Sequence, residues 1–204
     1  MNKLKSTKTQ LGNEICLLGN QNHSDILVIG VFHGDEPQGE YLINEFIKKY
    51  PNTPLLFIPC LNPDGKQLNT RTNSNGVDLN RNFPTKNWIL GEKDQFFGGS
   101  APASEIETQF LIDTIEEFMP KIILTLHAPY KVVNYDGPAK ELAKKVSEII
   151  NYPVEESIGY PTPGSFGTYA GIEKNIQTIT LELDEICPVQ DLVEPVHKIF
   201  VSLN

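Results

Sequence analysis

The sequence is poor in cysteine. Its 204 residues hold three cysteines, Cys16, Cys60 and Cys187, which are odd in number and far apart in the chain. This argues against a disulfide framework and against a zinc site built from cysteine. We expect all three to be reduced and buried, as free cysteines commonly are.

Positive charge and long apolar runs are also scarce. The formal net charge is −9, and basic residues cluster only in pairs such as Lys48-Lys49, which argues against a nucleic-acid partner and favours a small substrate. The basic first residues are not followed by the apolar segment of a signal peptide, and no later run is long enough to span a membrane. We therefore expect a cytoplasmic protein without a membrane partner.

Four short apolar runs predict the strands of a central sheet. They are rich in β-branched residues and too apolar to be half-exposed, so we expect both faces of each strand to be covered. The runs are Ile26–Phe32, Pro54–Cys60, Ile122–His127 and Thr178–Leu183.

Helical patterns lie between these strands. Gln38–Tyr50 is followed by Pro51, Glu105–Phe118 is preceded by a Ser104-x-x-Glu107 capping box, and Ala139–Ile150 follows Pro138. Val189–Leu203 also has a helical pattern, in which Pro195 should mark the start or a kink. Strands that alternate with helices predict an α/β fold, a mixed and largely parallel sheet with helices on both faces.

The stretch 62–100 is rich in Asn, Gly, Pro and Asp and has little periodicity. A loop of that length inside a compact domain is usually functional. No repeat, linker or low-complexity tract divides the chain, so residues 1–204 are expected to form a single catalytic domain.

Three residues have the chemistry of a catalytic metal site. His33-Gly-Asp-Glu36 directly follows an apolar strand, and His127 ends another, so all three side chains are expected at the carboxyl edge of the sheet. His-x-x-Glu alone also fits a surface turn that opens a helix. Together with His127, however, it makes a set of two histidines and one glutamate, which binds zinc and leaves a position open for water.

A fourth candidate, Glu182, stands near the end of the last apolar strand. A carboxylate between two leucines in a central strand is costly to bury, so a functional role is favoured over a satisfied core acid. We expect Glu182 to act as a general base that activates water.

The polar segment from Arg71 to Phe83 adds two guanidinium groups to an acidic protein. One arginine can stabilise the oxyanion of a tetrahedral intermediate, and an Asn-Arg pair can bind a substrate carboxylate through forked hydrogen bonds. Taken alone, the segment also fits a solvated polar loop, because Asn-Gly is common in turns.

Together these motifs resemble the zinc carboxypeptidase family, from about Ile26 to Leu183. The matching segments, in the family's order, are His33-x-x-Glu36, Gly76-Val-Asp-Leu-Asn-Arg-Asn-Phe83, Ser104-Glu-Ile-Glu-Thr108, Leu126-His127 and Thr180-Leu-Glu-Leu183. The resemblance implies one Zn²⁺ per chain, held by His33, Glu36 and His127, and hydrolysis of an amide bond next to a free carboxylate.

The resemblance also implies roles for five other residues. Asn80 and Arg81 would bind the terminal carboxylate of the substrate, and Arg71 would polarise the scissile carbonyl. Asp78 would orient His33 without touching the metal, and Tyr160 would close over bound substrate.

One branch of the family trims bacterial cell-wall peptides during recycling, and three segments resemble it: Gly159-Tyr-Pro-Thr-Pro-Gly-Ser-Phe-Gly-Thr-Tyr169, Asn62-Pro-Asp-Gly65 and Asn80-Arg-Asn-Phe-Pro84. This implies a murein tripeptide as the substrate, cut between γ-D-glutamate and meso-diaminopimelate. Phe166 and its small neighbours are expected to line the pocket for the leaving amino acid.

Two alternatives remain open at this point. Deacylases resembling aspartoacylase and succinylglutamate desuccinylase share a His-Gly-x-Glu turn and an Asn-Arg pair, and they remove an acyl group from a single amino acid. A catalytically silent member of the fold could instead bind a wall peptide without cleaving it.

Overall fold

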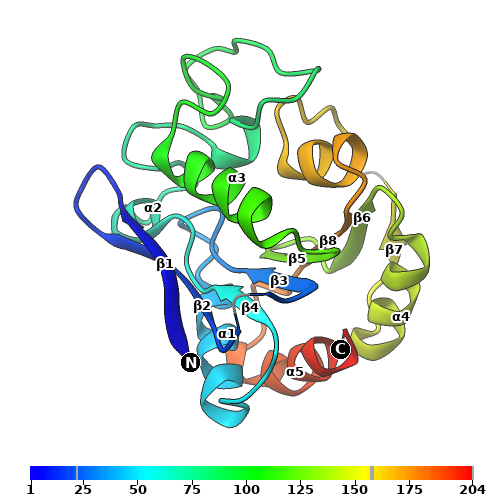
Figure 1. The fold of residues 1–204 in the computed structure, drawn as a ribbon. Helices are drawn as coiled ribbons and strands as arrows, with labels where there is room; N and C mark the ends of the chain where they lie inside the picture. The colour runs from blue at the N-terminus through cyan, green and yellow to red at the C-terminus, as the bar shows by residue number, and fades with distance from the viewer. Residues whose placement is uncertain (22, 157–158, 204) are drawn as a thin grey trace.

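The computed structural model describes residues 1–21, 23–156 and 159–203, and Figure 1 shows the fold. In these ranges eight strands form one mixed sheet in the order β1-β2-β4-β3-β5-β8-β6-β7. Their bounds are β1 (Asn2–Lys8), β2 (Glu14–Gly19), β3 (Ile26–Ile29), β4 (Leu56–Ile58), β5 (Ile122–His127), β6 (Val132–Asp136), β7 (Val154–Glu155) and β8 (Gln177–Glu182).

The four strands predicted from apolar runs are confirmed as the parallel centre of this sheet, β4-β3-β5-β8. Their side chains alternate between two cores: Val28 of β3 packs on one side, and Leu27 and Ile29 pack on the other. Because both faces are covered, every position in these strands can be apolar.

The helices cover both faces, which confirms the predicted fold class. Helices α1 (Gln38–Lys49), α4 (Lys140–Ile150) and α5 (Val193–Ser202) pack on one face, and α3 (Ile106–Phe118) with the short η2 segment (Gly167–Glu173) packs on the other (Figure 1). Shorter helical segments are α2 (Pro63–Leu68), η1 (Leu79–Arg81) and η3 (Val189–Leu192). None of the helices in the described ranges has the length and apolar character of a membrane span.

β3 ends three residues earlier than predicted because the backbone turns at Val31. This buried, β-branched residue has a φ of 54°, a conformation that costs free energy and is found mainly where surrounding contacts impose it. Two backbone hydrogen bonds supply such contacts, from Leu61 N to Gly30 O at 3.1 Å and from Asn62 N to Val31 O at 3.0 Å. The turn directs the following residues, Phe32 and His33, over the edge of the sheet.

The structure adds four strands that the sequence did not predict. β1 and β2 form an antiparallel hairpin at one edge, and β6 and β7 extend the other. β1 is mostly exposed and polar, so it carries no apolar signal. At the carboxyl end of the chain, Pro195 lies in the first turn of α5, as predicted.

The three cysteines are free, as expected, but each is partly exposed rather than buried in the core. Cys16 lies in β2, where only alternate residues face the core. Cys16 was therefore wrongly expected to be buried, because β2 is covered on one face only.

The predicted capping box is also wrong. Helix α3 begins after Glu105, and no side chain caps it. Glu107 is instead only 1% exposed and accepts a hydrogen bond from Asn73 Nδ2 at 3.3 Å. Asn73 Nδ2 also donates to Glu105 at 2.8 Å. The glutamates thus anchor the polar loop to α3 rather than closing the start of the helix.

This arrangement predicts an unusual pH dependence of stability. Burial raises the pKa of Glu107 to about 7, so between its unfolded value and pH 7 the folded chain binds a proton that the unfolded chain has released. Glu107 should therefore lower the free energy of unfolding as pH rises through this window, by up to about 1.4 kcal/mol per pH unit. In denaturant titrations, Glu107→Gln should become more stable relative to the parent from pH 5 to pH 7. A constant difference between the two proteins would contradict this.

Candidate active site

The three predicted metal ligands meet beyond the carboxyl ends of β3 and β5. His33 Nδ1 lies 2.9 Å from Glu36 Oε1, and His127 Nδ1 lies 3.2 Å from Glu36 Oε2 and 3.3 Å from His33 Nδ1. One nitrogen or oxygen from each of the three residues falls within 4.8 Å of the other two. Two imidazole nitrogens and a carboxylate, brought this close together, form a set that can hold a single metal ion.

This cluster is buried and yet rich in ionisable side chains, which is unusual for the interior of a protein. His33 is 3% exposed, and burial opposes its protonation, but the carboxylates of Glu36 and Asp78 outweigh this effect and raise the pKa of His33 to about 9. Burial likewise opposes ionisation of Glu36, yet the two histidines hold the pKa of Glu36 well below its usual range. The pocket therefore stabilises a cation beside Glu36.

The donor set fits zinc in particular. Zinc binds histidine nitrogen and carboxylate oxygen, and catalytic zinc sites commonly have three protein ligands. His33 Nε2 lies 3.3 Å from Asp78 Oδ1, so a carboxylate stands behind the ring while Nδ1 faces His127 and Glu36. A carboxylate in that position is typical of histidines that bind metal, because it fixes the ring and its tautomer.

Glu182 is the last residue of β8, where it pairs with His127 of β5 in parallel register. The residue is 6% exposed, and its buried Oε2 has no hydrogen-bond partner among the described residues. Burial raises the pKa of Glu182. A buried carboxylate beside a candidate metal centre, with one oxygen unused, has the position and the increased basicity of a general base.

Arg71 faces the same cluster. Its Nε and Nη2 bind Asp78 Oδ2 at 3.0 and 2.9 Å, and its Nη1 lies 3.3 Å from His33 Nδ1. Asp78 is fully buried, so Arg71 and His33 share one carboxylate. Arg71 thus presents a guanidinium edge to the side of the site where the candidate ligands converge.

Asn80 and Arg81 lie in the short helix η1. Asp78 caps this helix by accepting a hydrogen bond from Asn80 N at 2.9 Å. Asn80 Oδ1 is held by Phe166 N at 2.8 Å. The Arg81 guanidinium makes one hydrogen bond, to Asn80 O at 2.7 Å, and no ion pair with any described residue. Arg81 therefore keeps donors available for an external carboxylate.

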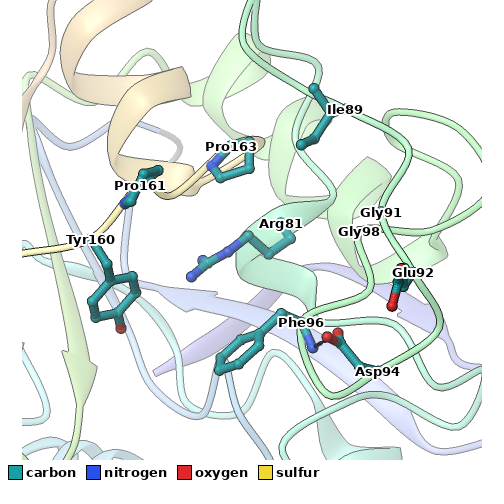
Figure 2. A pocket seen from close by; sticks show the side chains of 10 residues that line it. All are labelled: Arg81, Ile89, Gly91, Glu92, Asp94, Phe96, Gly98, Tyr160, Pro161 and Pro163. Carbon is teal, nitrogen blue, oxygen red and sulfur yellow. Dashed lines mark hydrogen bonds between the residues drawn. The ribbon is translucent and has the colours of Figure 1, made fainter.

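These groups, apart from the fully buried Asp78, line one cavity of about 510 Å³. It is lined by the three candidate ligands, Glu182, both arginines, Asn80 and Tyr160, among others. A neighbouring cavity of about 260 Å³ shares Arg81, Phe96 and Tyr160 with it. Figure 2 shows the Arg81 side chain reaching between Tyr160, which is 42% exposed, and Phe96.

Phe166 does not lie where the sequence analysis expected it. Its ring is 2% exposed and packs against Phe32 and Phe83 at centroid distances of 5.3 and 5.1 Å, inside the core. Its apolar ring is buried between these aromatics, while its neighbours Ser165 and Gly167 line a pocket. Phe166 therefore reaches the site through its backbone N–H, which orients Asn80.

That pocket was missed from the sequence. It measures about 120 Å³ and shares Asn80, Tyr160 and Glu182 with the main cavity. Asp136 at the end of β6 lines it, and burial raises the pKa of Asp136 to about 6. The Asp136 carboxylate has no cationic partner among the described residues. No signal in the sequence marked this residue, because β6 is only partly apolar and runs antiparallel to β8, which brings its last residue level with the start of β8.

Comparison with known proteins agrees with this geometry. The zinc carboxypeptidase family profile matches residues 2–152. Murein peptide amidase A of Escherichia coli is 35% identical over 176 residues, which cover 78% of this chain and 71% of the relative. The corresponding protein of Vibrio campbellii is 34% identical over 181 residues, covering 81% and 72%.

Solved structures agree as well. The murein-tripeptide amidase of Escherichia coli O157 matches with a TM-score of 0.85 and 29% identity, over 96% of this chain and 88% of that one. Carboxypeptidase A of Helicoverpa armigera has a TM-score of 0.76 at 16% identity, over 99% and 67%, and so shares the fold. This chain is a member of the zinc carboxypeptidase family.

Proposed function

We propose that this chain is a zinc-dependent amidase that hydrolyses the bond between γ-D-glutamate and meso-diaminopimelate in murein peptides. The observation that carries this proposal is the meeting of His33, Glu36 and His127 with Glu182 and both arginines in one cavity. The similarity to murein peptide amidases supports the choice of substrate.

In this proposal His33, Glu36 and His127 hold one zinc ion per chain. Bound zinc supplies Lewis acidity, which activates water for attack and polarises the scissile carbonyl. Asp78 keeps His33 in the orientation that points Nδ1 at the site.

Glu182 moves the proton. As water attacks the amide carbon, the unused Oε2 accepts the proton from that water and then delivers it to the leaving amine. Arg71 stabilises the negative charge that develops on the carbonyl oxygen. This contribution is specific to the transition state and therefore affects kcat.

Asn80 and Arg81 bind the free carboxylate next to the scissile bond. Arg81 keeps most of its donors unused, and a guanidinium edge matches a carboxylate through two parallel hydrogen bonds. Tyr160, beside Arg81 at the mouth of the cavity, covers the bound substrate.

The pocket next to Glu182 supports diaminopimelate as the leaving amino acid. Asp136, Glu156 and Glu182 line it together with hydroxyl and amide side chains, and its lining includes no lysine or arginine. Such a lining favours a side chain that ends in an ammonium group. Diaminopimelate carries one, together with a second carboxylate that the hydroxyl and amide groups can bind.

Two wider expectations belong to the same proposal. Residues 1–204 form one catalytic domain, which the participation of strands from both ends of the chain in one sheet supports. The enzyme acts in peptidoglycan recycling in the cytoplasm, where a murein tripeptide is its partner. The relatives named above are murein amidases and carboxypeptidases, which favours peptidase chemistry over the deacylase alternative.

The first test is hydrolysis of L-Ala-γ-D-Glu-meso-diaminopimelate. The zinc-loaded protein should release free diaminopimelate, detected by mass spectrometry, and a chelated sample should not. Glu182→Gln should retain zinc, measured by elemental analysis, and lose about 100- to 10,000-fold in kcat, which is the contribution of proton transfer by a positioned base.

Two outcomes would count against this proposal. Robust turnover by Glu182→Gln would reject its role as base. Tight binding of the peptide without turnover in the zinc-loaded protein would instead revive the non-catalytic alternative.

Arg81→Ala should weaken binding of free-acid substrates. A hydrogen bond to a charged group contributes about 1.5–3 kcal/mol, so KM should rise by about 10- to 100-fold. Amidation of the same carboxylate should raise KM of the parent enzyme by a similar factor and should change little in Arg81→Ala. Equal rates of the parent on the acid and the amide would reject the carboxylate clamp.

Asp136→Asn should reduce the preference for a cationic leaving residue. For γ-D-Glu-meso-diaminopimelate, KM should rise about tenfold, whereas the norleucine analogue, which has no ammonium, should be unaffected. The substitution keeps the volume that fits against Gly167. Glu156→Gln, at an exposed position of the same pocket, is the matched control and should change KM less. An unchanged preference in Asp136→Asn would argue against the ammonium site.

A further inference from the structure

The only two arginines of this chain contact the same aromatic ring. Arg71 and Arg81 are ten residues apart in the sequence. The carbon at the centre of each guanidinium lies over the Phe96 ring, 5.3 Å from its centroid for Arg71 and 5.8 Å for Arg81. Both distances are within the range of cation–π attraction.

Phe96 is held by the segment that carries Arg81. Its own N–H donates to Asp94 Oδ1 at 2.7 Å, which closes a tight turn. The two residues that follow are fixed from the other side: Phe97 O accepts from Asp78 N at 2.8 Å, and Gly98 O accepts from Asn82 Nδ2 at 2.8 Å. The backbone that carries Phe96 is therefore tied to the segment of η1, and the ring itself is 43% exposed.

An aromatic partner can orient a guanidinium without occupying the N–H groups that bind the substrate, whereas a carboxylate partner would occupy them. A guanidinium that must bind a substrate carboxylate needs to be oriented beforehand, yet a protein carboxylate would occupy the N–H edge that the substrate uses. The face of the guanidinium can rest on a ring while its edge stays available. Arg81, which has no ion pair among the described residues, depends most on such a contact.

We propose that Phe96 is a positioning residue that orients both guanidiniums for the substrate without itself taking part in the chemistry. This inference rests on the proposed function for the roles of the two arginines, but the contact it invokes can be tested without turnover. Phe96 also lines both of the adjoining cavities, and Figure 2 shows its ring beside the Arg81 side chain.

The contact can be measured by NMR of the arginine side chains. Because the chain has two arginines, the spectrum should show two Nε–Hε signals, which Arg81→Lys assigns.

Protons over a ring face are shifted upfield. Both signals should move downfield in Phe96→Leu and stay near the parent positions in Phe96→Tyr. Leu90→Ala, an exposed position of the same loop, should leave both unchanged. Signals that do not move in Phe96→Leu would overturn the proposal whether or not the protein is an amidase.

Kinetics then tests whether the contact matters for the reaction. In Phe96→Leu, kcat/KM on the free-acid peptide should fall about five- to thirtyfold, from the loss of two cation–π contacts. The preference for free-acid over amidated substrate should shrink, because only the former uses Arg81. Phe96→Tyr should restore both values, and a melting temperature within a few degrees of the parent would exclude unfolding. A full preference for the free acid in Phe96→Leu would also overturn the proposal. Absence of turnover in the parent would count against the proposed function alone.

Discussion

The site is organised around one buried carboxylate. Both oxygens of Asp78 are used: Oδ1 lies 3.3 Å from His33 Nε2 and accepts from Asn80 N, while Oδ2 binds Arg71 twice. A fully buried carboxylate is costly unless charged donors surround it, and those donors are then fixed by the same contacts. The candidate metal ligand His33, the guanidinium of Arg71 and the helix η1 are therefore positioned relative to one another by a single side chain.

The sequence predicted the centre of the fold and most of the site because both leave strong local signals. Four short, mostly apolar runs favour strands covered on both sides, and His33, His127 and Glu182 each stand at or next to the end of such a run. Since the carboxyl ends of parallel strands share one edge of the sheet, the positions of these residues followed from the strands themselves. The residues expected to converge do so, with the ring of Phe166 as the exception.

The parts that escaped prediction depend on contacts between residues distant in sequence. The strands β1 and β6, which were not predicted, carry polar residues on one side and lack a clear apolar period. Glu107 resembled a helix cap because its neighbours in the sequence fit that motif, whereas its partner Asn73 comes from a separate loop. Phe96 and Asp136 acquire their significance from groups that lie far away in the chain, so no motif marks them.

The register between β5 and β8 has a broader meaning. His127 and Glu182 are 55 positions apart, yet backbone hydrogen bonds place them opposite each other at the ends of adjacent strands. The separation between the candidate metal ligand His127 and the candidate base Glu182 is thus set by the spacing of a β-sheet, which side chains do not alter. Segments between these strands can lengthen, shorten or change composition over evolutionary time without disturbing that separation. In a scaffold of this kind, the loops that determine substrate preference can change during evolution while the geometry of the catalytic residues stays the same.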